Sequence, residues 1–398
     1  MPPQLPPLRL TGATILRDGE LQRRSLAFAE GRLVRGPLPE VDLSGYLLLP
    51  GIVDLHGDGF ERHMAPRPTV RFPMAAGLGS FDREAAAHGV TTAYLAQGWS
   101  WEGGHRGPDH AEEVMQALED YRPRALTDLR LQIRAETHLV EAAPRLLAAV
   151  RRHRIGYVVF NDHLAEGQHM ARISPVDFAA WARKVGRTAE DMAEVIEAAA
   201  LRGKEVPKTL RAMAEAFDAM GVVYGSHDDA DEDMRETFAA IGARIAEFPL
   251  TRRVAEVAQA MMSPVIMGAP NVVRGKSQAG NVSAAELAAA GLCDALVSDC
   301  HVPALPLAVW ALVDRHGMGL AEAWALVSTG PAEILRLQDR GRLDPGRRAD
   351  IAVVNEATRV IEATICGGRL AYLAGEAALR FMAQSATGLV EAEPVAAE

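Results

Sequence analysis

Imidazoles and carboxylates that follow apolar runs are the residues of this chain best suited to chemistry. Residues 48–58 read LLPGIVDLHGD, an apolar run that ends in His56, with Asp58 two positions later. In an extended strand, residues i and i+2 point to the same side, so both side chains can bind one cation at the strand's carboxyl end. An isolated H-x-D would more often lie solvated in a loop. The Pro-Gly step and the apolar run before it favour a metal site.

Later apolar runs end in the same residue types. These residues are Glu136, His163, His227 and Asp299. Imidazole and carboxylate ligands without thiolate suit a catalytic site for one or two divalent cations, with Zn2+ preferred and Mn2+ or Fe2+ as alternatives. We expect His56, Asp58, Glu136, His163 and His227 to be ligands, and Glu136 could bridge two cations. Asp299 would take a proton from the attacking water.

A glycine-rich segment with basic residues indicates an anion site. Residues 267–283 read MGAPNVVRGKSQAGNVS, in which glycines allow close backbone approach and a helix is expected to begin near Ser283. Such a loop suits phosphate groups, although it matches no P-loop pattern and could instead be a solvated turn. Arg67 would lie at the same barrel mouth, and His301 could contact substrate. The polar and charged residues that we expect to bind phosphate or substrate are Arg67, Arg274, Lys276, Ser277, Asn281 and His301.

Composition narrows the class of protein. The 398 residues are 48% hydrophobic and carry a formal net charge of −10, which argues against nucleic acid or an anionic membrane as the main partner. No apolar run is long enough to span a membrane, and the first residues lack the pattern of a signal peptide. Three widely spaced cysteines make a disulfide framework or a Cys-rich zinc site a poor interpretation. We therefore expect a cytoplasmic protein, and the net charge does not exclude a local basic pocket for a small phosphorylated substrate.

Eight apolar runs alternate with helical stretches between residues 50 and 336. Such alternation is typical of βαβ units with a parallel sheet, and eight units predict an α/β fold with a (β/α)8 barrel of the TIM type. Its active site would lie at the carboxyl ends of the strands. After the run that ends at His56, the expected strands are 91–96, 131–136, 156–160, 222–226, 244–247, 265–267 and 295–298.

Both chain ends are expected to contribute to a second domain. Short strand-like runs in 1–49 and 337–380 predict a small composite β-sandwich domain, and residues 381–398 a flexible tail. Residues 167–220 predict a helical insertion in the barrel, with a capping box at Thr188 and Asp191. This insertion would be a lid or one wall of the substrate pocket, or a plain helical excursion.

Several stretches together resemble a known family. The split β-domain, the PGIVDLH strand and the PGRRADIAVV segment resemble the amidohydrolase superfamily across nearly the whole chain. Within it, the chain is similar to the ribose 1-methylphosphonate 5-triphosphate diphosphatase family of the carbon–phosphorus lyase pathway. The stretches that carry this similarity are His56-x-Asp58 with 66–68, Arg134-x-Glu136, Asp162-His163 with 167–168, 226–229, 245–249, 268–275, 280–282 and Ser298-Asp299.

The resemblance implies metal-dependent hydrolysis of a ribose 5-triphosphate that releases diphosphate and leaves the 5-phosphate. A homodimer is compatible with it. Two other interpretations remain open at this point. An amidohydrolase or deaminase acting on a cyclic C–N substrate would use the same ligands and Asp299 but would not need Arg274 and Lys276. A non-catalytic component of a phosphonate-degrading assembly would bind no stoichiometric metal.

Overall fold

Eight parallel strands form the central sheet of the computed structural model, which describes residues 4–67, 70–277 and 280–387. Each strand pairs with the next one in the chain, and a bridge between Gly57 and Asp299 joins the last strand to the first. The predicted barrel is confirmed. Its strands are β8 (Ile52–Gly57), β9 (Val90–Trp99), β10 (Asp128–Glu136), β11 (Tyr157–Asn161), β12 (Val223–His227), β13 (Ile245–Glu247), β14 (Val265–Gly268) and β15 (Ala295–Val297).

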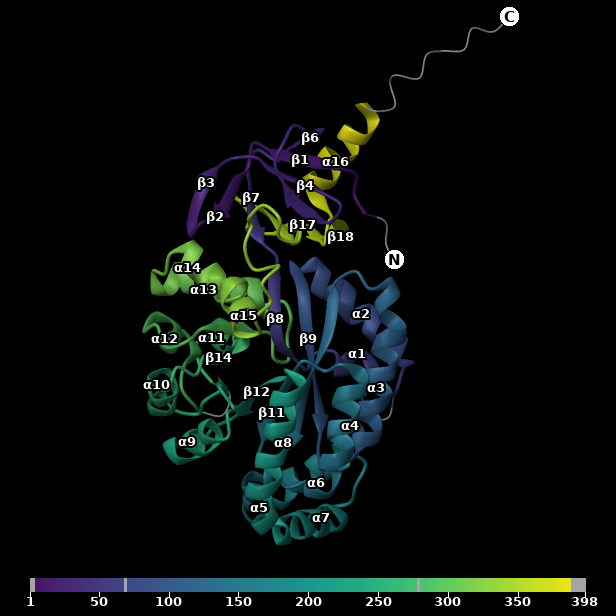
Figure 1. The fold of residues 1–398 in the computed structure, drawn as a ribbon, viewed down its shortest axis with the longest axis vertical. Helices are drawn as coiled ribbons and strands as arrows, with labels where there is room; N and C mark the ends of the chain where they lie inside the picture. Colours follow the sequence, from purple (N-terminus) through teal and green to yellow (C-terminus); the bar gives the residue numbers. More distant parts are fainter. Residues whose placement is uncertain (1–3, 68–69, 278–279, 388–398) are drawn as a thin grey trace, which may run out of the picture.

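Helices follow the strands and lie around the outside of the barrel (Figure 1). Three glycines at helix ends, Gly221, Gly275 and Gly317, take the left-handed conformation that stops α8, α11 and α13. The helices are α1 (Glu61–Met64), α2 (Met74–Ala87), α3 (Pro108–Tyr121), α4 (Ala143–His153), α8 (Val206–Met220), α9 (Glu232–Ala240), α10 (Arg252–Ala260), α11 (Ala269–Arg274), α12 (Ala284–Ala289), α13 (Ala304–His316), α14 (Leu320–Ala325) and α15 (Thr329–Ile334).

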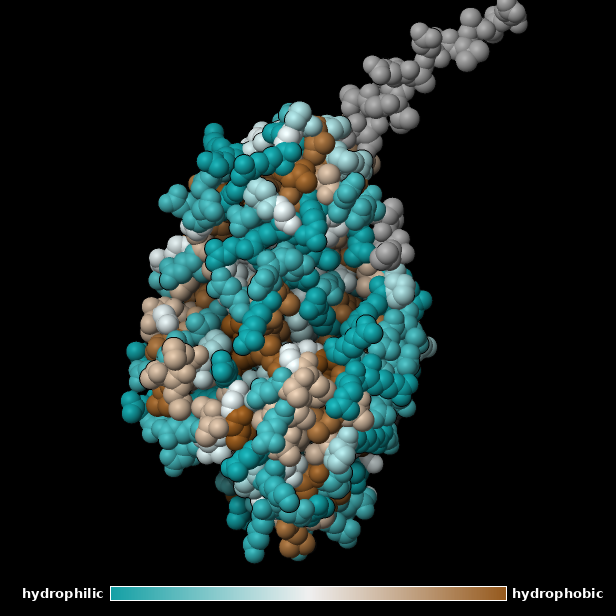
Figure 2. Space-filling view, viewed as in Figure 1, coloured by the Kyte–Doolittle hydropathy of each residue, from teal (hydrophilic) through white to brown (hydrophobic). Residues whose placement is uncertain are grey.

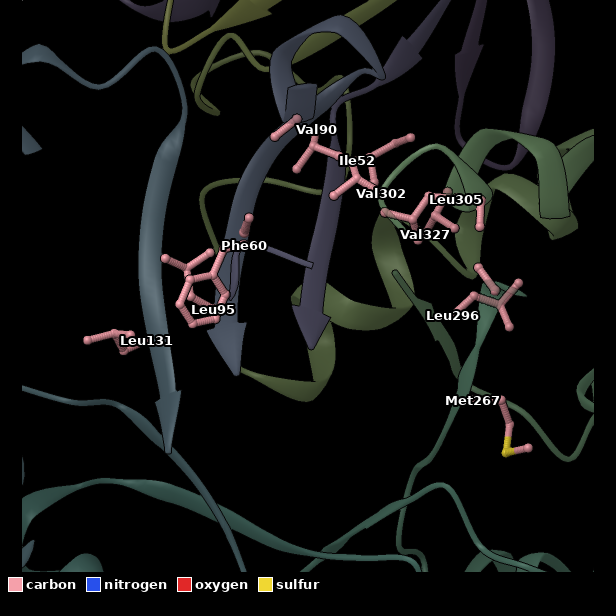
Figure 3. Packing of buried hydrophobic residues seen from close by; sticks show 14 of the residues in the cluster. Ile52, Phe60, Val90, Leu95, Leu131, Met267, Leu296, Val302, Leu305 and Val327 are labelled. Atoms are coloured by element: carbon pink, nitrogen blue, oxygen red, sulfur yellow. The ribbon is translucent and has the colours of Figure 1, made fainter. Parts of the chain in front are cut away.

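Most barrel strands are buried on both faces, although β10 alternates apolar residues with Arg130, Gln132 and Arg134. On β8, Ile52 contributes to the core beneath the helices, whereas Val53 and Leu55 contribute to the interior of the barrel. Figure 3 shows part of the outer core, including Ile52, Leu95 and Leu131 from three neighbouring strands. A parallel sheet covered by helices buries both faces, so its strands read as continuous apolar runs. This explains why the barrel strands could be located from the sequence.

A β-domain made from both ends of the chain lies at the amino-terminal side of the barrel (Figure 1). Antiparallel pairing of β7 with β16 joins the two chain ends in one six-stranded sheet, and a four-stranded sheet packs with it around a separate core. The predicted composite domain is thereby observed. Its strands are β1 (Leu8–Thr11), β2 (Thr14–Arg17), β3 (Glu20–Arg23), β4 (Leu26–Ala29), β5 (Arg32–Val34), β6 (Glu40–Asp42), β7 (Tyr46–Pro50), β16 (Ile351–Asn355), β17 (Ile361–Cys366) and β18 (Arg369–Leu373).

The carboxyl-terminal segment differs from the expected tail. Helix α16 (Gly375–Thr387) buries Ala377 and Phe381 in the core of the β-domain, so residues 381–387 are helical. An apolar stripe with a docking surface stabilises a short helix that composition alone would not predict. Residues 388–398 of the expected tail lie outside the described residues.

Three helices are inserted after β11, at the end of the barrel away from the β-domain (Figure 1). They are α5 (Leu164–Ile173), α6 (Pro175–Lys184) and α7 (Ala189–Leu201). The capping box at Thr188 is present, and Phe178, Met192 and Ile196 belong to a core of their own. The insertion is shorter than predicted: α8 packs on α4 and β12 and is the barrel helix of this unit. Both segments are rich in alanine, so composition did not separate them.

The surface seen in Figure 2 is largely hydrophilic, with smaller groups of hydrophobic residues. One such group lies at the lower end of the view, where Figure 1 places the inserted helices. In the described part of the chain, no helix combines the length and apolar composition needed to cross a membrane.

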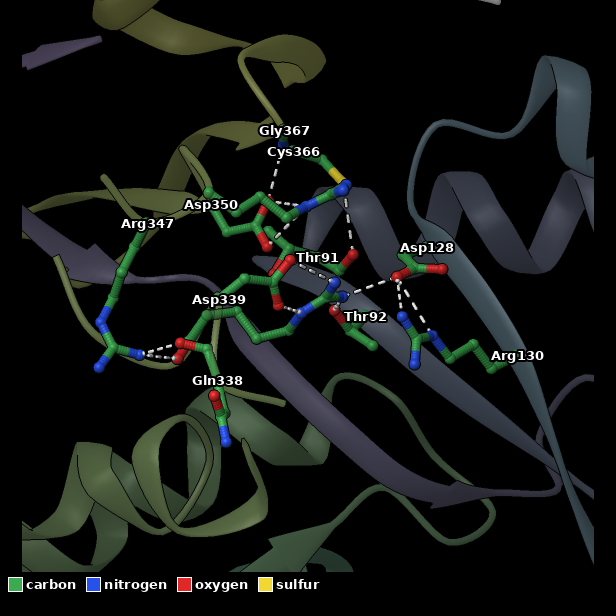
Figure 4. A network of polar contacts seen from close by, with 12 residues as sticks. Thr91, Thr92, Asp128, Arg130, Gln338, Asp339, Arg347, Asp350, Cys366 and Gly367 are labelled. Atoms are coloured by element: carbon green, nitrogen blue, oxygen red, sulfur yellow. Dashed lines mark hydrogen bonds and ion pairs between the residues drawn. The ribbon is translucent and has the colours of Figure 1, made fainter. Parts of the chain in front are cut away.

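A buried ion-pair network joins the β-domain side to the amino-terminal ends of the barrel strands (Figure 4). Arg340 donates to the Thr92 hydroxyl and to Asp128 Oδ2, each at 2.7 Å, and its side chain is 4% exposed. Asp128 also accepts from Arg130, and the two arginines hold the pKa of Asp128 well below its usual range against the opposing effect of burial. Arg348 and Asp350 form a second pair nearby.

We expect Arg340→Ala to lower the free energy of unfolding by about 2–3 kcal/mol, because it leaves Asp128 without one of its buried partners. Arg342→Ala is the matched control: its side chain is 46% exposed and pairs with Glu333, so the loss should be below about 1 kcal/mol. Urea unfolding followed by circular dichroism measures both. Equal losses for the two variants would contradict a structural role for the Arg340 network.

Candidate active site

A cavity of about 640 Å3 opens at the carboxyl ends of the barrel strands. Strand-end residues form its floor, and α5, α6 and α11 contribute to its walls. Most of the predicted ligand residues therefore face one space. The titratable residues that line it are His56, Asp58, Glu102, Arg106, Arg134, His163, Glu166, Asp177, Lys184, His227, Asp228, Arg274, Asp299 and Cys300.

Left-handed backbone at three strand ends shapes the cavity floor. Two of these residues, Asp228 and Phe248, directly follow β12 and β13, and Asp299 lies two residues after β15. Their φ angles are 59°, 55° and 51°. Non-glycine residues adopt this conformation at a cost of about 1 kcal/mol or more, and they cluster at functional sites. Here the turn ends each strand abruptly, so that His227 and Glu247 occupy the last strand positions.

The first cluster consists of His56, His227 and Glu247, whose ligand atoms lie within 4.8 Å of one another. His56 Nδ1 is 2.9 Å from Glu247 Oε2, and His227 Nε2 is 3.8 Å from the same oxygen. The hydrogen bond to Glu247 places a proton on His56 Nδ1 and leaves Nε2 able to donate to a cation. Burial lowers the pKa of His56, but the Glu247 carboxylate outweighs it and raises that pKa overall.

Glu247 was not among the expected site residues. Its side chain is fully buried, and its Oε1 accepts hydrogen bonds from Gln132 Nε2 at 2.8 Å and from the Tyr157 hydroxyl at 3.0 Å. Although burial raises the pKa of Glu247, the neighbouring His56 and the other donors lower it below the usual value. The signal was available, because Glu247 ends the sixth barrel strand in the same way that Glu136 ends the third.

A second cluster brings together Glu102, Glu136 and His163, again with ligand atoms within 4.8 Å of one another. His163 Nδ1 makes a short hydrogen bond with Glu136 Oε1. Glu102 comes from the loop after β9 and was also missed, because it lies three residues beyond its strand. Asp228 lies between the clusters, with Oδ2 at 2.9 Å from His227 Nδ1 and at 4.0 Å from His163 Nε2.

The donor set fits a divalent cation. His227 is buried, and among the described residues neither of its ring nitrogens has a hydrogen-bond partner with acceptable geometry, although Asp228 is near. A buried unsatisfied imidazole costs free energy unless another partner satisfies it. Burial lowers the pKa of His227, which keeps the ring neutral and able to bind metal. Neutral imidazole beside several carboxylates is the chemistry of a zinc or manganese site.

Asp58 and Asp299 lie side by side where the first and last strands meet. The Asp58 N–H donates to the Asp299 carbonyl at 2.9 Å, and the Asp299 N–H donates to the His56 carbonyl at 2.9 Å. Both side chains line the cavity. Burial raises the pKa of Asp299, which makes its carboxylate a stronger base than an exposed aspartate.

The expected phosphate-binding residues divide into two groups. Arg274, Ser277 and Asn281 line the cavity. Among the described residues, Lys276, Arg67 and His301 lie outside it, and all three are exposed. The segment is also less irregular than a loop: α11 occupies 269–274, because Pro270 suits a first helical turn and Gly275 ends it. Ser283 caps α12 as expected.

The inserted helices form one wall of the cavity. Gly167 and Met170 of α5 and Lys184 of α6 line it, and Trp181 Nε1 donates to Glu102 Oε2 at 2.8 Å. Arg187 Nε donates to the Glu102 carbonyl at 2.8 Å. The insertion is thus hydrogen-bonded to a residue of the second cluster, which gives it a direct place in the site.

Comparisons with known proteins agree with this architecture. Solved structures with the same fold include A. niger ochratoxinase, with 15% identity, a TM-score of 0.63 and coverage of 94% of this chain and 97% of that one. The β-aspartyl dipeptidase of Fervidobacterium islandicum AW-1 gives 16% identity, a TM-score of 0.59 and coverage of 93% and 97%. At these identities the similarity shows the fold alone.

Sequence similarity identifies the family. Residues 177–372 match the model of the amidohydrolase family. Over 354 residues the chain is 32% identical to the α-D-ribose 1-methylphosphonate 5-triphosphate diphosphatase of Escherichia coli (strain K12). The matched region covers 87% of this chain and 91% of that protein. The chain is therefore a metal-dependent hydrolase of the amidohydrolase superfamily and belongs to the family of this diphosphatase.

Proposed function

We propose that this enzyme hydrolyses α-D-ribose 1-methylphosphonate 5-triphosphate to the 5-phosphate and diphosphate. The observation that carries the proposal is one cavity lined by Arg274 and by members of both His–carboxylate clusters, His56 and His227 from the first and Glu102 and His163 from the second. Such a site combines metal ligands with a cation for a charged leaving group, as triphosphate hydrolysis requires. The similarity to the Escherichia coli diphosphatase supports the choice of substrate.

The two clusters would hold divalent cations, which we propose to be Zn2+. His56 and His227 would donate imidazole nitrogens at the first cluster, with Asp58 and Glu247 balancing the charge. His163 would donate at the second cluster, with Glu136 and Glu102. When bound, such a cation supplies a Lewis acid that lowers the pKa of water and polarises a phosphoryl oxygen.

Asp299 is proposed to move the proton. Its carboxylate lies on the cavity floor beside Asp58 and above the bridge between the first and last strands. We propose that an Asp299 carboxylate oxygen accepts the proton of the water that attacks the α-phosphorus. Because burial raises the pKa of Asp299, the carboxylate holds this proton more readily than an exposed aspartate would.

Arg274 is proposed to stabilise the leaving diphosphate. It is the last residue of α11 and lines the cavity together with Ser277 and Asn281. A guanidinium can donate two parallel hydrogen bonds to phosphate oxygens. The leaving group would therefore lie toward the β14 side of the barrel mouth.

We expect metal-dependent release of diphosphate from ribose 1-methylphosphonate 5-triphosphate, with ATP as the comparison substrate. Chelation should abolish release because the imidazole and carboxylate clusters lose their cations, and added Zn2+ should restore it. Diphosphate is measured by a coupled assay, and bound metal by elemental analysis of the same sample. Absence of release from metal-loaded enzyme would rule out this substrate.

We expect Asp299→Asn to lower kcat by about 100-fold or more, since the amide cannot accept the proton. Bound metal should stay the same, because the substitution keeps the shape of the side chain. His227→Ala should instead lose metal together with activity. Asp233→Asn, an exposed change on α9, is the control. Full turnover by Asp299→Asn would contradict its assignment as proton acceptor.

We expect Arg274→Gln to lower kcat by about 100-fold, because one cationic donor to the developing charge is worth a few kcal/mol. Lys276→Gln, on the same segment but outside the cavity, should lose much less. Steady-state kinetics of diphosphate release distinguish the two variants. Losses of similar size in the two variants would contradict the assignment of Arg274 to the leaving diphosphate.

A further inference from the structure

A second cavity of about 470 Å3 lies beside the active site and has no part in the chemistry described so far. Its walls come from the segment after β8 and from the segment after β9, and Lys184 of α6 lines both this cavity and the active-site cavity. The two cavities therefore adjoin at Lys184.

Four cationic side chains and two carboxylates, Glu61 and Glu113, line this cavity, so its lining carries a net positive charge. Arg67, Arg71 and Lys184 line it, and none of them forms an ion pair or side-chain hydrogen bond with any residue that the structure describes. Arg62 also lines it but is paired with Glu84. Unpaired cations gathered around a cavity indicate an anionic ligand, since they would otherwise only repel one another.

The same cavity also has an apolar part. Met64, Phe72 and Met74 line it, and the Phe72 side chain is 52% exposed. A large aromatic ring left open to solvent at a cavity is well suited to cover an apolar group of a ligand. The lining therefore fits a group that is both anionic and apolar, more closely than it fits a bare phosphate.

We propose that this second cavity binds the methylphosphonate ester at C1 of the substrate, a proposal that rests on the function proposed above. Its charged oxygens would face Arg67, Arg71 and Lys184, and its methyl group would contact Phe72 and the two methionines. The two anion sites are separate: Arg274 follows β14 and lines the active-site cavity but not the second one, which adjoins the segments after β8 and β9.

The test compares two substrates in metal-loaded full-length enzyme. One carries methylphosphonate at C1 and the other is ribose 5-triphosphate with a free C1 hydroxyl. The variant is Arg71→Gln with Lys184→Gln, and Arg183→Gln is the matched control, since Arg183 is exposed on α6 next to Lys184 and lines neither cavity. We expect KM for the methylphosphonate substrate to rise about tenfold or more, and KM for ribose 5-triphosphate to change less than twofold.

Other outcomes overturn the proposal in distinct ways. An equal rise of KM for both substrates would assign these cations to the triphosphate, and no rise would remove them from binding. If the unmodified enzyme hydrolyses neither substrate, the proposed function fails. Calorimetric titration with ribose 1-methylphosphonate 5-phosphate then still decides the second cavity: binding weakened in the double variant but not in Arg183→Gln supports it, and binding that is absent or unaffected refutes it.

Discussion

The barrel closes where the buried carboxylate of Asp54 on β8 accepts two hydrogen bonds from Ser298, the residue after β15. The Ser298 N–H donates at 2.9 Å and its hydroxyl at 2.6 Å. Burial raises the pKa of Asp54 to about 6, so the carboxylate is ionised at neutral pH and the bonds are charge-assisted. Since β8 and β15 otherwise meet at a single backbone bridge, this pair brings His56 and Asp58 next to Asp299.

Charge compensation explains why so many ionisable groups can be buried at one end of the barrel. The side chains of three ionisable residues, Glu247, His56 and His227, are at most 6% exposed. Both imidazoles lie near the Glu247 carboxylate. The Glu247 carboxylate is hydrogen-bonded to His56, and it also accepts hydrogen bonds from Gln132 and Tyr157 inside the barrel. A preorganised site of this kind loses little free energy to rearrangement during a reaction.

The two ends of the barrel have different roles. At the amino-terminal end, the β-domain and the Arg340 network stabilise the strands. At the carboxyl end, the inserted helices, α11 and the segment after β8 build two adjoining cavities. This division is general for parallel barrels, because the variable loops gather at the carboxyl ends of the strands.

The sequence alone determined the strands, the composite β-domain and the residue types at the strand ends. Continuous apolar runs could be recognised because both faces of the sheet are buried, and His56, Glu136 and His227 could be placed because each ends such a run. The order of strands in the barrel then required these residues to converge.

Only the tertiary structure decided which neighbours the strand-end residues contact. Glu247 pairs with His56, and Glu102 approaches His163. Arg274 lines the cavity, whereas Lys276 does not. These placements depend on backbone turns and on the packing of segments far apart in the chain. The boundary between α7 and α8 was equally hidden, since both helices are rich in alanine. Spacing along a chain fixes direction within one strand, but distances between strands come from the packing of the whole fold.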